Sequence, residues 1–169
     1  MLTSFQWRWG VAQWVECLKD KEIPVLLRTQ ALIQALASLD AASTAAISAR
    51  ELAGYVFADP YLSLKLLRHA ENRRSRRLGQ ETTTTLAAVL HTGWNELVQL
   101  VSASSVSDDS CKGRNDCEFR AVLASSIARG WAGLRSDVSP DEVALAALLS
   151  ESGELLLWYF APELPLKVA

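Results

Sequence analysis

Apolar residues recur every three or four positions along most of the chain, whereas the strict alternation that is typical of strands is almost absent. The first of these stripes predicts a helix with a buried apolar face near the start of the chain, and Trp9 falls outside it. Later stripes each predict one apolar helix face. The stripes consist of Trp7, Val11, Trp14 and Leu18; Val25, Leu32, Leu36 and Leu39; Leu62, Leu66 and Leu67; Trp94, Leu97, Val98 and Val101; and Phe119, Leu123, Ile127 and Trp131. The pattern predicts an all-α fold.

Polar residues mark where the predicted helices begin. Ser48 and Glu51 have the spacing of a capping box, in which each side chain accepts a hydrogen bond from a backbone N–H of the first turn. Asp59 before Pro60 combines a capping carboxylate with a residue that lacks an N–H. Residues 139–142, Ser-Pro-Asp-Glu, carry the strongest start signal in the chain. The remaining boundaries are a helix start at Pro24, a loop over residues 102–116 and a helix break at Gly153.

The composition fits one folded domain. Half of the 169 residues (50%) are hydrophobic and 21% are charged, so we expect a compact single-domain helical bundle over residues 1–169. The 17 basic and 19 acidic residues give a net charge of −2, which provides no overall attraction to nucleic acid or to acidic membranes. The uninterrupted apolar runs are too short to span a bilayer. An odd number of cysteines (3) without a secretory apolar segment favours free thiols in the cytoplasm.

Several short segments occur in a fixed order along the chain. They are residues 23–26 (IPVL), 51–53 (ELA), 59–68 (DPYLSLKLLR), 85–93 (TLAAVLHTG) and 146–157 (AALLSESGELLL). In order and spacing they resemble the bacterial HD-related output domain (HDOD) family, over about residues 14–162. The resemblance implies an all-helical fold shared with HD-type metal-dependent phosphohydrolases, and a regulatory role. Members of the family usually extend further than this chain, so the resemblance implies a shortened version.

The resemblance also identifies the position of the lost catalytic site. Ser150 and Glu151 stand where the hydrolases carry their His-Asp dyad, so they mark a vestigial cleft. The chain further departs from the family pattern at Glu71 and Asn72, where Asn-Ser is frequent, and around residues 119–122, where a histidine is common.

The residues themselves give little support for catalysis. Metal-assisted phosphate hydrolysis needs several imidazole and carboxylate ligands around one or two ions, and the chain has only 2 histidines, His69 and His91. Cys111 and Cys117 lack further ligands at zinc-binding spacing. We therefore expect no metal, no cofactor and no enzymatic activity. The rival hypothesis is a divergent phosphohydrolase whose metal site is rebuilt from Glu151, Asp59 and the histidines.

Charge is strongly segregated along the chain. Residues 65–77 are basic and residues 136–166 contain acidic residues but no lysine or arginine before Lys167. Guanidinium groups pair well with phosphate or carboxylate oxygens, so the basic segment is a candidate anion-binding or partner-binding surface. Its candidate residues are Arg68, Arg73, Arg74, Arg76 and Arg77. A solvated helix end would carry the same charge pattern.

The sequence thus predicts a non-catalytic bacterial signalling module that binds a partner protein or a small signal molecule. The expected partner is another protein with an acidic surface, or a second copy of this chain. A small phosphorylated ligand is the alternative. Nucleic acid is disfavoured because the arginines lie at a predicted helix end and not along a helix that could enter the major groove.

Overall fold

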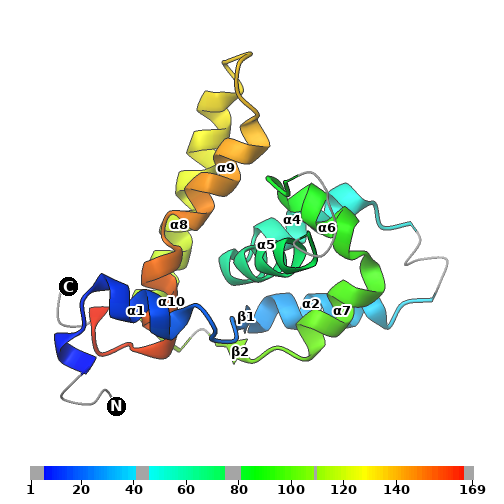
Figure 1. The fold of residues 1–169 in the computed structure, drawn as a ribbon. Coiled ribbons are helices and arrows are strands. Elements are labelled where there is room, and N and C mark those ends of the chain that lie inside the picture. Colours follow the sequence, from blue (N-terminus) through cyan, green and yellow to red (C-terminus); the bar gives the residue numbers. More distant parts are fainter. Residues whose placement is uncertain (1–5, 41–45, 75–80, 109, 166–169) are drawn as a thin grey trace.

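Helices make up most of the chain in the computed structural model, which describes residues 6–40, 46–74, 81–108 and 110–165 (Figure 1). The elements are η1 (Gln6–Arg8), α1 (Val11–Leu18), β1 (Val25–Leu26), α2 (Leu27–Ala37), α4 (Ala49–Phe57), α5 (Pro60–Arg74), α6 (Thr85–Thr92), α7 (Trp94–Ser102), β2 (Val106–Ser107), α8 (Lys112–Ala132), α9 (Pro140–Leu149) and α10 (Ser152–Phe160). The predicted all-α fold class is confirmed.

The predicted capping residues begin their helices as expected. The Ser48 hydroxyl accepts a hydrogen bond from the Glu51 N–H at 3.1 Å, and the Glu51 carboxylate accepts one from the Ser48 N–H at 2.8 Å. Asp59 accepts from the Leu62 N–H at 3.0 Å, and Ser139 caps α9. Each cap satisfies a backbone donor that the first helical turn leaves without a partner.

The largest core lies between α2, α4, α5, α6 and α7, which form the right-hand part of Figure 1. Leu62 and Leu66 of α5 and Leu97 and Val101 of α7 are fully buried there. The inward positions predicted for these two helices are therefore confirmed, because helical spacing places each pair on one face.

The helix start predicted at Pro24 is wrong. Residues 25–26 form β1, which pairs in parallel with β2, and α2 begins directly after β1 at Leu27, three residues beyond Pro24. Tertiary partners hold the amides of this segment in an extended conformation: the Val25 N–H donates to the Ser105 carbonyl at 2.9 Å, and the Leu26 N–H donates to the Asp59 carboxylate at 2.9 Å. The predicted loop over residues 102–116 is also too long, because β2 lies within it and α8 begins at Lys112.

Helices α8 and α9 form an antiparallel hairpin that projects from the rest of the fold (Figure 1). Its interior contains Ala121, Leu145 and Leu148. The chain then bends at residues 150–151 before α10, so the break predicted at Gly153 is displaced, and Gly153 lies inside α10.

The first predicted stripe is not buried. No residue of α1 is buried, and Val11 is 81% exposed. The reason is the position of α1 at the edge of the molecule, beside α10, where it covers little of the core (Figure 1).

One stretch of the described chain, Pro140–Phe160, is long and apolar enough to cross a membrane by length and composition, and 28% of its apolar window is buried. The uninterrupted apolar runs within this stretch are shorter, because acidic residues lie between them. Helices α9 and α10, which share this stretch, both pack against α8.

Candidate functional site

The bend between α9 and α10 carries the two residues predicted to mark the vestigial cleft. Ser150 is exposed, and its hydroxyl donates to the Ala147 carbonyl at 2.7 Å, so it closes the end of α9. Glu151 is half-buried and directs its carboxylate toward α8. The structure therefore assigns the two neighbours different roles, and only Glu151 belongs to a cluster of chemical groups.

Arg120 of α8 is the centre of that cluster. One guanidinium nitrogen, Nη2, lies 3.2 Å from a Glu151 carboxylate oxygen and 2.7 Å from a Glu154 carboxylate oxygen. The Trp158 indole N–H donates to the other Glu154 oxygen at 3.1 Å. These bonds set the single positive charge of Arg120 against the carboxylates of Glu151 and Glu154 and hold the bend against α8.

Cys117 completes the cluster from one turn earlier on α8. Its sulfur is fully buried and lies 3.9 Å from Glu151. Burial, with the nearby charge of Glu154, raises the pKa of Cys117 to about 12, so the thiol stays protonated at neutral pH. Burial opposes ionisation of Glu154 as well, but the bonds from Arg120 and Trp158 outweigh it and lower the pKa of Glu154.

Cys117, Glu151 and Glu154 bring three possible ligand atoms within 4.8 Å of one another, so we tested this cluster as a metal centre. The donor set does not fit the ion of a phosphohydrolase. The Arg120 guanidinium already bonds both carboxylates, the thiol is protonated, and the cluster contains no imidazole.

The other ligands of the rival phosphohydrolase hypothesis are engaged elsewhere. His69 contacts Glu96 at 2.9 Å, His91 contacts the Thr82 hydroxyl at 3.1 Å, and Asp59 accepts from two backbone amides. Within the described residues, none of them joins Glu151 in a ligand cluster.

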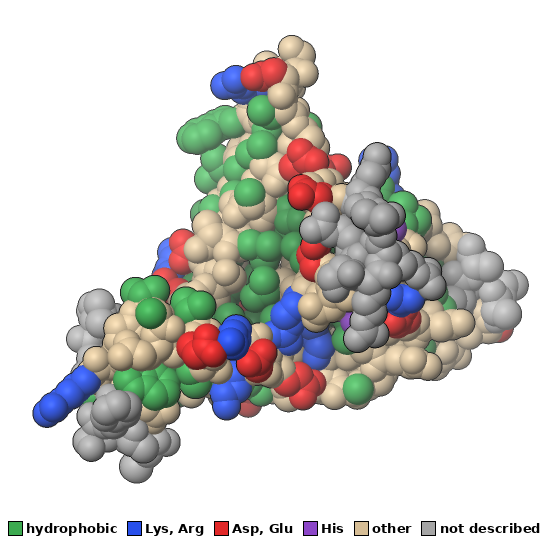
Figure 2. All heavy atoms as spheres, in the orientation of Figure 1, with side chains coloured by type: hydrophobic (Ala, Val, Ile, Leu, Met, Phe, Trp, Pro, Cys, Tyr) green, Lys and Arg blue, Asp and Glu red, His purple; other side chains and the backbone are tan. Residues whose placement is uncertain are grey.

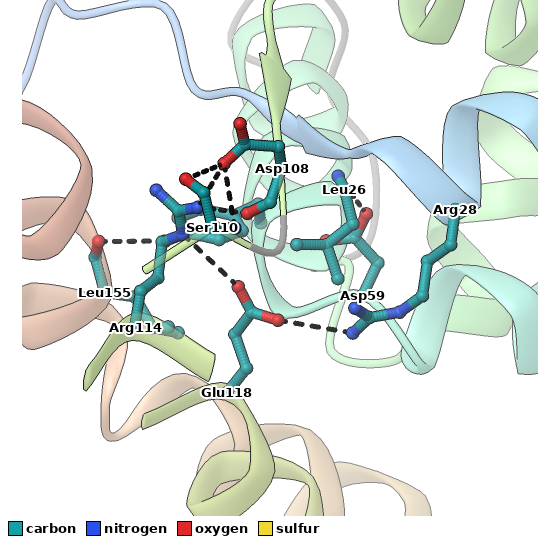
Figure 3. A network of polar contacts seen from close by, with 9 residues as sticks. Leu26, Arg28, Asp59, Asp108, Ser110, Arg114, Glu118 and Leu155 are labelled. Carbon is teal, nitrogen blue, oxygen red and sulfur yellow. Dashed lines mark hydrogen bonds and ion pairs between the residues drawn. The ribbon is translucent and has the colours of Figure 1, made fainter. Parts of the chain in front are cut away.

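A second polar network joins the start of α8 to Arg28 of α2 and to Asp108, which follows β2 (Figure 3). Glu118 is only 4% exposed, and its carboxylate lies 3.3 Å from an Arg28 nitrogen. Arg114, also buried, donates to an Asp108 carboxylate oxygen at 3.0 Å. The Arg114 Nε and Glu118 Oε1 atoms lie 3.9 Å apart, which is an ion pair without a hydrogen bond.

Burial dominates the electrostatics of this network. It raises the pKa of Glu118 despite the neighbouring arginines, and Asp59 adds to that rise. Burial likewise raises the pKa of Asp59, against the hydrogen bonds that favour its carboxylate. The sequence analysis missed Glu118, because a single glutamate in an amphipathic helix is indistinguishable from a solvated one.

The sequence model of the HDOD domain family matches residues 31–169. The chain belongs to the HDOD family. No curated protein and no solved structure gives a significant match. HDOD domains are found in signalling-related proteins, and the family is generally considered a non-catalytic relative of the HD hydrolases.

The arginine segment of this HDOD domain is only partly described. The Arg68 guanidinium donates to the Lys19 and Lys21 carbonyls at 3.2 and 2.9 Å, and Arg73 forms an ion pair with Glu96. Arg74 is the last residue of α5, and Arg76 and Arg77 lie outside the described residues. A shared anion-binding surface over these arginines therefore stays a prediction.

The last predicted stripe points away from the HDOD core. Phe119, Leu123, Ile127 and Trp131 are 68%, 47%, 45% and 72% exposed. Figure 2 shows hydrophobic side chains gathered along the projecting hairpin. Helix α8 instead packs on α9 through its opposite face, which carries small residues such as Ala121 and Ser125. Close helix packing uses these small residues and leaves the large ones in solvent.

Proposed function

We propose that this HDOD domain is a non-catalytic regulatory module of the bacterial cytoplasm that acts by binding protein. The observation that carries this proposal is the exposed apolar row of α8, formed by Phe119, Leu123, Ile127 and Trp131. Contiguous apolar surface of this kind marks interaction sites in folded proteins. The bonds of Arg120 to the carboxylates of the vestigial cleft support the non-catalytic half of the proposal.

The occupant that we propose for this row is the same row on a second copy of the chain. The arginines beside the row are already neutralised: Arg120 by Glu151 and Glu154, and Arg129 by Asp141 at 3.2 Å. The row itself carries no charge and these two arginines are paired, so an identical apolar row complements it. Two-fold symmetric pairing of one patch with itself is the commonest arrangement among soluble oligomers.

Light scattering coupled to size-exclusion chromatography tests the pairing across a wide range of protein concentrations. We expect a dimer that persists at high salt, because apolar contacts are not screened by ions. Leu123→Glu places a charge in the middle of the row and should give a monomer. Leu90→Glu, which changes an exposed leucine on α6, is the matched control and should leave the dimer intact.

A wild-type chain that is monomeric at every concentration would overturn the pairing. A dimer that dissociates at high salt and is unaffected by Leu123→Glu would also overturn it, and would favour contact between the basic and acidic segments instead.

A further inference from the structure

An open apolar groove separates α1 from α5 and α10. Its volume is about 590 Å³, within the range of small-molecule sites. The walls include Trp14 and Val15 of α1, Leu64 of α5, and Leu156 of α10. Val15 is 60% exposed although it faces this groove, so the apolar surface here is only partly covered by the fold.

The groove carries one unbalanced positive charge. Two charged residues line it, Lys19 and Arg68, and no acidic residue does. Lys19 forms an ion pair with Glu16 at 2.5 Å. Arg68 forms no ion pair within the described residues, and its hydrogen bonds to the Lys19 and Lys21 carbonyls both use Nη1. The guanidinium is thus held in place with donors left for a ligand.

From this combination we infer that the groove binds a long-chain carboxylate, with the aliphatic chain between α1 and α10 and the carboxylate on Arg68. The inference is independent of the pairing through α8, which uses another surface. The apolar walls suit a chain that has no polar groups of its own to satisfy. The fixed guanidinium suits a single anionic headgroup.

Peptide occupants fit the groove less well. An extended peptide would bury backbone N–H and C=O groups against walls that offer almost no hydrogen-bonding partners. An aliphatic carboxylate avoids this difficulty.

Isothermal titration calorimetry of the full chain with laurate, below its critical micelle concentration, tests the inference. We expect saturable binding of about one laurate per chain, because one guanidinium without an ion pair among the described residues, that of Arg68, lines this groove. Arg68→Gln should weaken laurate binding about tenfold, the loss of one charge-assisted contact, while Arg68→Lys should retain part of the affinity. Lys19→Gln should have no effect, because Lys19 is already neutralised.

Two further measurements distinguish the contribution of the carboxylate headgroup from that of the aliphatic chain of the ligand. Dodecanol has the same chain length without the charge, so it should bind more weakly than laurate and be insensitive to Arg68→Gln. Val15→Glu adds a carboxylate to the groove at an exposed position and should abolish laurate binding, whereas Leu123→Glu on α8 should not change it. Unfolding midpoints identify any variant that has lost its fold.

Binding that does not saturate, or that is equal for laurate and dodecanol and unchanged in Arg68→Gln, would overturn the inference. Sedimentation with vesicles of anionic phospholipid, lost in Val15→Glu, together with no binding of free laurate, would overturn it in favour of a membrane surface.

Discussion

At the scale of single residues, the buried carboxyl of Glu118 couples the stability of the fold to pH. A carboxyl whose pKa is higher in the folded chain than in the unfolded chain binds protons more tightly when folded. Its stabilising contribution is therefore complete below the ordinary pKa of 4.5 and is lost as the pH rises through the raised folded-state pKa.

We predict that Glu118→Gln flattens the pH dependence of stability. Glutamine keeps the shape and an oxygen that can accept from Arg28, but it has no proton to lose. Between pH 4.5 and neutrality, the free energy of unfolding of the wild type should fall more steeply than that of the variant, by up to about 1.4 kcal/mol per pH unit. Urea unfolding at a series of pH values measures both slopes, and equal slopes would contradict this account of Glu118.

The role of a residue was predictable from the sequence when its partner lies close to it along the chain. Ser48, Asp59 and Ser139 were predictable because a cap is satisfied within three residues of itself. Glu118 was not, since its partner Arg28 lies 90 positions away. The resemblance singled out Glu151, and its partner Arg120 appears only when α8 and α10 pack together.

At the scale of elements, the joint between α8 and α10 depends on a close approach. Gly113, in the first turn of α8, faces the buried indole of Trp158, and a Cβ atom at this position would lie at or inside 3.0 Å from three ring carbons. That separation is shorter than real Cβ contacts allow. The glycine is therefore required by packing, and not by backbone conformation.

We predict that Gly113→Ala destabilises the chain by about 1–3 kcal/mol, because the added methyl group overpacks this joint. Gly130→Ala is the matched control on the same helix, with nothing within 4 Å of the added carbon, and should be neutral or stabilising by about 0.5–1 kcal/mol. Urea unfolding midpoints compare the two variants. Equal effects at the two sites would show that Trp158 does not limit how closely α8 approaches α10.

The starts of helices were predictable where a capping residue lies next to them in the sequence. Helices α4, α5 and α9 have caps, and their starts were correct. Strand β1 has two residues, too few for any periodicity, and it exists because the Ser105 carbonyl, directly before β2, and the Asp59 carboxylate accept from its amides. The apolar stripe of α8 indicated a helix but could not show which side faces the core, because the seam with α9 is made of small residues.

At the scale of the whole molecule, the described residues include two open apolar surfaces, the row on α8 and the groove between α1, α5 and α10. Both present apolar surface that the fold itself leaves open. Arg120 already pairs with Glu151 and Glu154, the two carboxylates that a metal ion at this bend would need. This pairing supports the proposed role in recognition.

Calorimetric titration of Mn²⁺ into the metal-free chain tests this central claim most directly, because Mn²⁺ suits carboxylate ligands and supports phosphoester hydrolysis. Since Arg120 already bonds Glu151 and Glu154, we predict no saturable binding by the wild type, and weak binding only after Arg120→Ala leaves the two carboxylates without their cation. Binding of one ion per wild-type chain that disappears in Glu151→Gln would contradict the account.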